Sequence, residues 1–362
     1  MPLFRFKSLI YLTFILSLCV IALGAYTRLT EAGLGCPDWP GCYGFLSVPQ
    51  SSEQQLLAQL AFPDAHVEVD KAWNEMVHRY FAGCLGLLIL VINVIAWRRP
   101  ATPKLLPALL LGTVIFQALL GMWTVTLVLM PVVVMGHLLG GFTTASLLLL
   151  LALRVRQQEI LHQLPRASLS RQSFSSPQLL SQSQSLPALQ AMALVALLMV
   201  AGQIALGGWT AANYAAVACT QLPICEVDWL LHFDMSAFEP IQPEHDSYQY
   251  GVLNYHQRVS IHVAHRIGAM VTTIVLVLLM WRLWRQSVPR RYGVGVGIAL
   301  ALQLCLGITN VVASLPLLVA VGHNLVGAIL LLILVATNHH LYCWRDVQRY
   351  SDKLAPEGRS HG

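Results

Sequence analysis

Long apolar runs with at most one charged residue recur along most of the chain. Four of these runs are each about 20 residues long, the length that an α-helix needs to cross a bilayer core of roughly 30 Å. Two longer runs have room for two crossings each, because Pro131 and Pro316 lie where a tight turn would join the two helices. The pattern therefore predicts eight transmembrane spans, within residues 8–27, 76–97, 105–153, 186–209, 261–281 and 292–344.

The apolar runs are continuous and do not alternate with period two, so they favour helices over the strands of a membrane barrel. Of the 362 residues, 56% are hydrophobic and only 11% are charged, less than half the charged share that is usual in soluble domains. This composition excludes an ordinary water-soluble enzyme. The expected fold is an all-α integral membrane protein, embedded in the lipid bilayer.

Positive charge is distributed unevenly among the connecting segments. Most of the Lys and Arg residues lie in the short connections and at the two ends of the chain, whereas the two long loops, residues 28–74 and 211–260, carry most of the acidic residues. The positive-inside rule predicts cytoplasmic termini and periplasmic long loops, as in a multi-pass protein of the bacterial inner membrane. The net charge of +5 then reflects topology, and we read no nucleic-acid binding into it.

The second half of the chain repeats the first. Gly24, Cys36 and Cys42 match Gly207, Cys219 and Cys225, each 183 positions later, and similar offsets relate His78 to His265 and His137 to His323. Gln117 and Gly121 likewise match Gln303 and Gly307. We therefore expect two pseudo-symmetric four-helix bundles joined by a flexible Ser/Gln-rich cytoplasmic linker. The predicted division is 1–153 for the N-terminal unit, 154–185 for the linker, 186–345 for the C-terminal unit and 346–362 for a cytoplasmic tail.

Each predicted unit carries two histidines near the outer ends of two different helices, His78 with His137 and His265 with His323. Two imidazoles from neighbouring helices of a bundle suit axial ligation of a heme iron, with apolar helix faces around the porphyrin. A single histidine inside a membrane could equally be a hydrogen-bonded packing residue. Two matched pairs favour ligation.

Arg79 and Arg266 directly follow a histidine of each pair. A guanidinium at the membrane boundary can pair with a heme propionate. The alternative is that both side chains simply extend to the interface, as arginines at helix ends often do.

Four cysteines form two short pairs in the loops that are expected to face outward, Cys36 with Cys42 and Cys219 with Cys225. An oxidising compartment favours a disulfide in each pair. Metal binding is the alternative, but too few further ligands are nearby in the sequence to complete a tetrahedral site. A thiol relay is a second alternative for the first pair.

At these residues the sequence resembles the heme A synthase family, over nearly the whole chain. The family oxidises the C8 methyl group of heme O to a formyl group by successive hydroxylations, which supplies heme A for terminal oxidases. The motifs that carry the resemblance are TRLT at 27–30, GL at 33–34, CPDWPGC at 36–42, EMVHR at 75–79, GHLLGG at 136–141, HVAHR at 262–266 and GHN at 322–324.

The resemblance implies that the N-terminal unit binds heme O through His78 and His137 as the substrate site. It also implies that the C-terminal unit keeps a heme b between His265 and His323. Heme A is then the product, heme O synthase a partner, and a membrane redox partner or quinone the electron acceptor. A homo-oligomer is compatible with this assignment.

One position differs between the two halves in a way that fits the assignment. Glu75 lies three residues before His78 on the same helical face, whereas His262 occupies the matching place before His265. Oxidation of a methyl group releases protons, and a carboxylate beside the porphyrin could accept one or stabilise positive charge. The alternative is an interfacial acid that the outer loop solvates.

Two rival functions come from other classes. A quinol-linked diheme b-type electron carrier would hold two permanent hemes in the same frame. A transporter would also show repeats and ionisable groups within the membrane, but both halves here start on the same side and no paired interrupted helices are visible.

Overall fold

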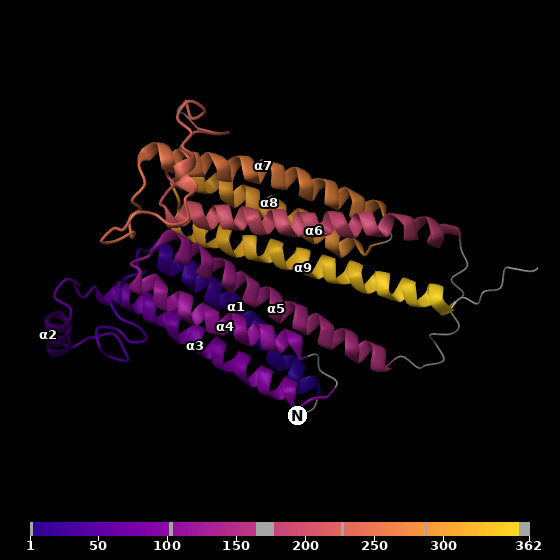
Figure 1. The fold of residues 1–362 in the computed structure, drawn as a ribbon, viewed down its shortest axis with the longest axis horizontal. Coiled ribbons are helices and arrows are strands. Elements are labelled where there is room, and N and C mark those ends of the chain that lie inside the picture. The colour runs from indigo at the N-terminus through magenta and orange to yellow at the C-terminus, as the bar shows by residue number, and fades with distance from the viewer. Residues whose placement is uncertain (1–2, 101–103, 164–176, 226–227, 287, 355–362) are drawn as a thin grey trace, which may run out of the picture.

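The computed structural model describes residues 3–100, 104–163, 177–225, 228–286 and 288–354. The regular elements in these ranges are all helical (Figure 1). They are α1 (Leu3–Leu29), α2 (Ser52–Ala61), α3 (Val69–Trp97), α4 (Leu105–Thr126), α5 (Pro131–Gln163), α6 (Pro177–Ala212), the short 3₁₀ helix η1 (Met235–Phe238), α7 (Tyr255–Arg285), α8 (Arg290–Val312) and α9 (Leu317–Leu354).

Eight of these helices, all except α2 and η1, are long and apolar enough to cross a membrane. They coincide with the eight predicted spans, so the expectation of an all-α, multi-pass membrane protein is confirmed. The proline turns are also where the sequence placed them, because α5 begins at Pro131 and α9 begins just after Pro316.

Three helices extend into the segments that were predicted to be linker or tail. Helix α5 continues to Gln163 and helix α6 begins at Pro177, so the first and last parts of the predicted linker are helical. Proline is favoured in the first turn of a helix, and the Ser, Gln and Leu residues that follow it do not interrupt one. Helix α9 likewise continues into the predicted tail as far as Leu354. The remaining parts of the linker and the tail, residues 164–176 and 355–362, lie outside the described residues.

The eight long helices form two groups with the same order of contacts. In the first group α1 packs against α3 and α5, and α4 packs against α3 and α5; in the second, α6 packs against α7 and α9, and α8 packs against α7 and α9. Helices α1 and α5 meet α6 and α9 between the groups, as the side-by-side bundles of Figure 1 show. The matching order supports the predicted duplication.

The backbone repeats at the outer helix ends as well. Helices α4 and α8 both end in a Schellman motif, in which the amides of Leu129 and Leu315 donate to Thr124 O and Asn310 O over 2.8 Å. Leu129 and Leu315 have left-handed φ values of 66° and 63°. The same motif ends α1 and α6, with left-handed residues at Glu31 (φ 55°) and Tyr214 (φ 53°).

The outer ends of the two groups are tied together across the interface. The Arg28 guanidinium at the end of α1 donates to Tyr214 Oη over 2.6 Å and lies 4.2 Å from the centre of its ring. The second long loop reaches back over the first group, where the Gln249 amide donates to Glu31 O and the Tyr248 amide donates to Val128 O, both over 3.0 Å. Hydrogen bonds therefore connect the two halves at the end that carries the long loops.

Candidate functional site

The structure brings together the first pair of predicted histidines. His78 on α3 and His137 on α5 have ring centroids 6.4 Å apart, and their ring planes lie at 82° to each other. A metal–imidazole bond of about 2 Å on each side places two axial rings roughly 6 Å apart, centre to centre. The observed separation therefore suits a metal ion between the two rings.

His265 on α7 and His323 on α9 occupy the matching places in the second group and are close enough to interact electrostatically. Both pairs come from the second and fourth long helices of their group. The sequence prediction of one imidazole from each of two helices thus agrees with the arrangement in both halves.

Each of the four imidazoles faces a glycine on a neighbouring helix. An added Cβ at these glycines would lie against the imidazole Cε1 atom, at or near the closest distances that real Cβ atoms show. The glycines therefore leave clearance that any other residue would close. The distances from the added Cβ to Cε1 are 3.0 Å for Gly24 and His78, 3.4 Å for Gly121 and His137, 3.1 Å for Gly207 and His265, and 3.1 Å for Gly307 and His323.

The hydrogen bonding of the ring nitrogens indicates the role of these histidines. The Nδ1 atoms of His78, His137 and His323 are buried and make no hydrogen bond within the described residues. Buried polar atoms are normally paired, so packing alone is a poor explanation for these rings. The described residues also contain no cluster of three or more His, Cys, Asp or Glu that could hold a bare metal ion. Pairs of imidazoles with glycine clearance instead fit heme, whose porphyrin supplies the other four ligands.

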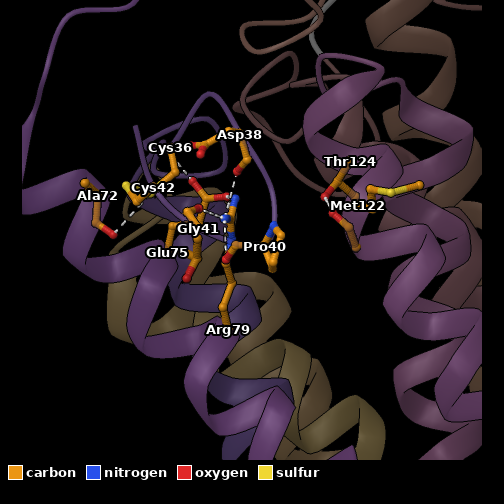
Figure 2. A network of polar contacts seen from close by, with 12 residues as sticks. Cys36, Asp38, Pro40, Gly41, Cys42, Ala72, Glu75, Arg79, Met122 and Thr124 are labelled. Carbon is orange, nitrogen blue, oxygen red and sulfur yellow. Dashed lines mark hydrogen bonds and ion pairs between the residues drawn. A yellow bond between two sulfur atoms is a disulfide. The ribbon is translucent and has the colours of Figure 1, made fainter. Parts of the chain in front are cut away.

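Glu75 is buried and ties the first histidine helix to the outer loop (Figure 2). One of its carboxylate oxygens accepts a hydrogen bond from the Cys36 amide over 2.9 Å, and the other pairs with the Arg79 guanidinium over 2.5 Å. Arg79 in turn donates to Asp38 O over 2.9 Å and to Gly41 O over 2.5 Å. A buried carboxylate needs such partners, because an unpaired charge is costly in the interior.

The second half keeps the arginine contacts without the acid. Arg266 donates to Gln221 O over 2.6 Å and also to Ile224 O, which are the carbonyls that match Asp38 O and Gly41 O. At the place of Glu75, His262 has its Nδ1 atom 2.9 Å from Ala215 O. The predicted asymmetry at this position is therefore built into the surrounding contacts.

Both predicted cysteine pairs are disulfides. The sulfur atoms are 2.00 Å apart in Cys36–Cys42 and 2.21 Å apart in Cys219–Cys225. Within the first loop the Tyr43 hydroxyl donates to His66 O over 2.6 Å, and burial raises the pKa of Tyr43 to about 12, so this donor keeps its proton. The loop that positions Glu75 is thus closed covalently and by hydrogen bonds.

Sequence reasoning missed several residues around the histidines. Gln303 lies with Nε2 3.2 Å from Nε2 of His323, and Gln203 lies with Nε2 3.0 Å from Nδ1 of His265. Gln303 belongs to the repeat, which was a usable signal. Gln203 does not, because Val20 occupies its matching place, so only the departure from the repeat could have pointed to it.

Comparison with known proteins agrees with this geometry. The sequence profile of the cytochrome oxidase assembly protein family matches residues 7–335. A curated heme A synthase from Shewanella oneidensis is 48% identical over 335 residues, which cover 92% of this chain and 96% of that protein. Heme A synthases from Rhizorhabdus wittichii and Halalkalibacterium halodurans are 26% and 22% identical, over 90% and 88% of this chain and 91% of each of those proteins. The chain therefore belongs to the cytochrome oxidase assembly protein family.

Proposed function

We propose that this chain is a membrane heme A synthase, which oxidises the C8 methyl group of heme O to the formyl group of heme A. The observation that carries the proposal is the pair of matched imidazole sites, set in a chain that is 48% identical to a heme A synthase along nearly its full length. The product would serve cytochrome oxidase assembly, in keeping with the family.

We assign the substrate to the first group of helices and a resident cofactor to the second. His78 and His137 would hold heme O, whereas His265 and His323 would hold heme b. The asymmetry at Glu75 supports this order, because only the first pair has a buried carboxylate one helical turn from a ligand. When bound, the hemes supply the one-electron chemistry at iron that the oxidation requires.

Within this assignment Glu75 has the catalytic role. The Cys36 amide and Arg79 fix its two oxygens, so the carboxylate is held in one orientation. A carboxylate fixed beside the substrate can accept a proton from the reacting carbon or stabilise positive charge that develops there.

Propionate pairing by Arg79 and Arg266 stays a prediction. Both guanidinium groups donate to carbonyls of the disulfide loops. A guanidinium has five N–H donors, so it can serve a loop carbonyl and a carboxylate at the same time. We therefore propose that each arginine links its loop to a propionate of the heme below it.

The proposed orientation of the protein in the membrane indicates which partners each site would meet. With cytoplasmic termini and periplasmic disulfide loops, all four ligand histidines lie towards the outer leaflet. Heme O synthase would deliver the substrate within the bilayer, and a membrane redox partner or quinone would exchange electrons with the heme b unit.

The proposed chemistry is tested by replacing Glu75 and identifying the porphyrins that the purified protein carries. Glu75→Gln keeps a side chain of the same shape that can still bond to the Cys36 amide, so we expect near-normal heme content. Extracted porphyrins, identified by mass, should shift from heme A to unoxidised or half-oxidised heme O. His262→Gln is the matched control at the equivalent position, and it should leave the product unchanged. Normal heme A formation in Glu75→Gln would remove Glu75 from the mechanism.

A further inference from the structure

A small cavity lies between α6 and α7, at the end of these helices that is opposite the long loops in Figure 1. Its volume is about 70 Å³, several times what one water molecule needs. The membrane span of α6 begins at Leu186 and that of α7 ends at Arg285, so the cavity lies where the spans meet the lipid headgroups. The residues that line it are Ala188, Leu189, Met192, Arg282 and Gln286.

In the first half, larger side chains fill the matching place. Leu189 matches Phe6, 183 positions earlier, and Gln286 matches Arg99, 187 positions earlier. Phe6 is fully buried, and the Arg99 guanidinium lies 4.9 Å from the centre of its ring. The residue that matches Arg282 is Ile95. The second half therefore has a cavity and an arginine where the first half has an aromatic ring and an isoleucine.

The positive charge at the cavity has no acidic side chain near it in the sequence. Residues 160–225 and 247–345, which include the spans of α6, α7 and α8, contain no Asp or Glu. Arg282 makes no hydrogen bond or ion pair with another described residue, and its guanidinium lies 5.7 Å from the Trp281 ring centre. A guanidinium has five N–H donors. The cavity therefore suits an anion that comes from outside the chain.

The surface that continues from the cavity is apolar. Val195 lies two turns after Ala188 on α6 and is 50% exposed, and Leu278 lies one turn before Arg282 on α7 and is 47% exposed. Both residues lie deeper in the spans than the cavity. Trp284 is exposed at the level of the cavity, where tryptophan is common in membrane proteins. A ligand with an anionic head and apolar chains matches this sequence of surfaces.

We propose that the cavity binds the headgroup of an anionic phospholipid, whose phosphate accepts hydrogen bonds from Arg282 and from the Gln286 side-chain amide. A planar guanidinium matches the oxygens of a phosphate, and basic pockets between membrane helices bind anionic headgroups. The acyl chains lie along Val195 and Leu278. The site is at the opposite end of the spans from the histidines, so it does not depend on the heme assignment.

The main test replaces Arg282 by the residue of the first half. The full chain, purified in detergent, is titrated with phosphatidylglycerol or with phosphatidylcholine of the same acyl chains, and bound lipid is counted by native mass spectrometry. We expect wild type to prefer phosphatidylglycerol. Loss of hydrogen bonds to a charged group weakens binding by about ten- to a hundredfold, so Arg282→Ile should weaken phosphatidylglycerol binding by that factor. Arg282→Lys keeps the charge and should keep the preference.

Two further variants separate the cavity from general charge. Leu189→Phe introduces the ring of the first half and fills the cavity without changing charge, so it should also weaken phosphatidylglycerol binding. Arg98→Gln removes an exposed arginine at the end of α3, outside the cavity, and should leave binding unchanged. Thermal unfolding in phosphatidylcholine nanodiscs checks that each variant is folded.

Three outcomes would overturn the proposal. Equal binding of the two lipids by wild type would mean that the cavity does not select an anionic headgroup. Equal weakening by Arg98→Gln and Arg282→Ile would show a general effect of charge. Glycerol phosphate, which has the headgroup chemistry without acyl chains, should compete only at much higher concentration than the lipid. Competition at similar concentrations would identify the ligand as a free phosphate ester.

Discussion

At the residue scale, the groups that touch the four imidazoles determine how tightly each site is packed. Glycines face all four rings, and an alanine at any of these positions would put a methyl group at the edge of ordinary contact distance or inside it. Overpacking of a tight interface costs about 1–3 kcal/mol, roughly a five- to hundredfold loss in binding. Alanine substitutions at these glycines therefore test each of the two sites separately.

We predict that Gly24→Ala and Gly207→Ala each empty one site selectively. The added methyl group of Gly24→Ala displaces His78, so heme O and heme A should be depleted while heme b stays. Gly207→Ala should deplete heme b instead. The measurement is porphyrin analysis of purified protein by mass and optical spectrum. Gly83→Ala on α3 is the control, because an added Cβ there meets nothing within 4 Å. Equal loss of both hemes in each variant would contradict the assignment.

Sequence reasoning was most informative about residues that occur twice. The histidine and cysteine pairs stood out because each has a partner at a matching offset, and the structure places them as expected. Gln203 was missed because it occurs only once, and a single polar residue in an apolar run has no pattern to mark it. The Cys36 amide was missed as a partner of Glu75 because it is a backbone group of a loop, whose path no periodicity describes.

At the element scale, the disulfide loops contact the helices that carry the histidines. The amide of Cys36 holds Glu75, whereas in the second half His262 takes the place of Glu75 and contacts Ala215 O. Both loops are closed by a disulfide, but the first holds the carboxylate of Glu75 and the second lies beside His262.

We therefore predict unequal effects from removing the two disulfides. A disulfide that closes a loop of this length contributes about 2 kcal/mol, so both double variants should unfold at lower temperature. Only Cys36→Ser with Cys42→Ser should also slow the conversion of heme O, because it frees the loop that orients Glu75. The measurements are thermal unfolding in detergent and the ratio of heme A to heme O. An equal heme ratio in the two double variants would show that the first loop does not position the carboxylate.

The ends of the helices were harder to predict from the sequence than the membrane spans. Apolar runs gave all eight spans, because the bilayer determines their length and composition. They did not give the end of α5, the start of α6 or the end of α9, because these helices run on through polar sequence. Hydropathy marks the part of a helix that lies in lipid, and helix formation outside lipid depends on local propensity and packing.

At the scale of the whole molecule, duplication puts both histidine pairs at the same end, near the starts of α3, α5, α7 and α9. The second loop donates hydrogen bonds to Glu31 O and Val128 O of the first half, and Arg28 of the first half donates to Tyr214 of the second. These hydrogen bonds connect the two halves at this end. In the proposed assignment, the substrate site and the heme b site would lie at this same end of the molecule.

The orientation of that end is open to a direct test. We predict that Ser52→Cys, on exposed α2, reacts with a membrane-impermeant maleimide in spheroplasts, whereas Arg290→Cys, at the exposed start of α8, reacts only after permeabilisation. Wild-type protein measures background from its four free cysteines. The reverse pattern would invert the topology and place the disulfide loops in the cytoplasm.

The most direct test of the central claim is the identity of the hemes in purified protein, by pyridine hemochrome spectra and porphyrin mass. We predict about one heme b together with heme O or heme A in wild type. His78→Ala and His137→Ala should lose the heme O and heme A, and His265→Ala and His323→Ala should lose the heme b. Two equivalents of unmodified heme b would instead identify an electron carrier, and colourless protein from cells that make heme O would contradict heme binding altogether.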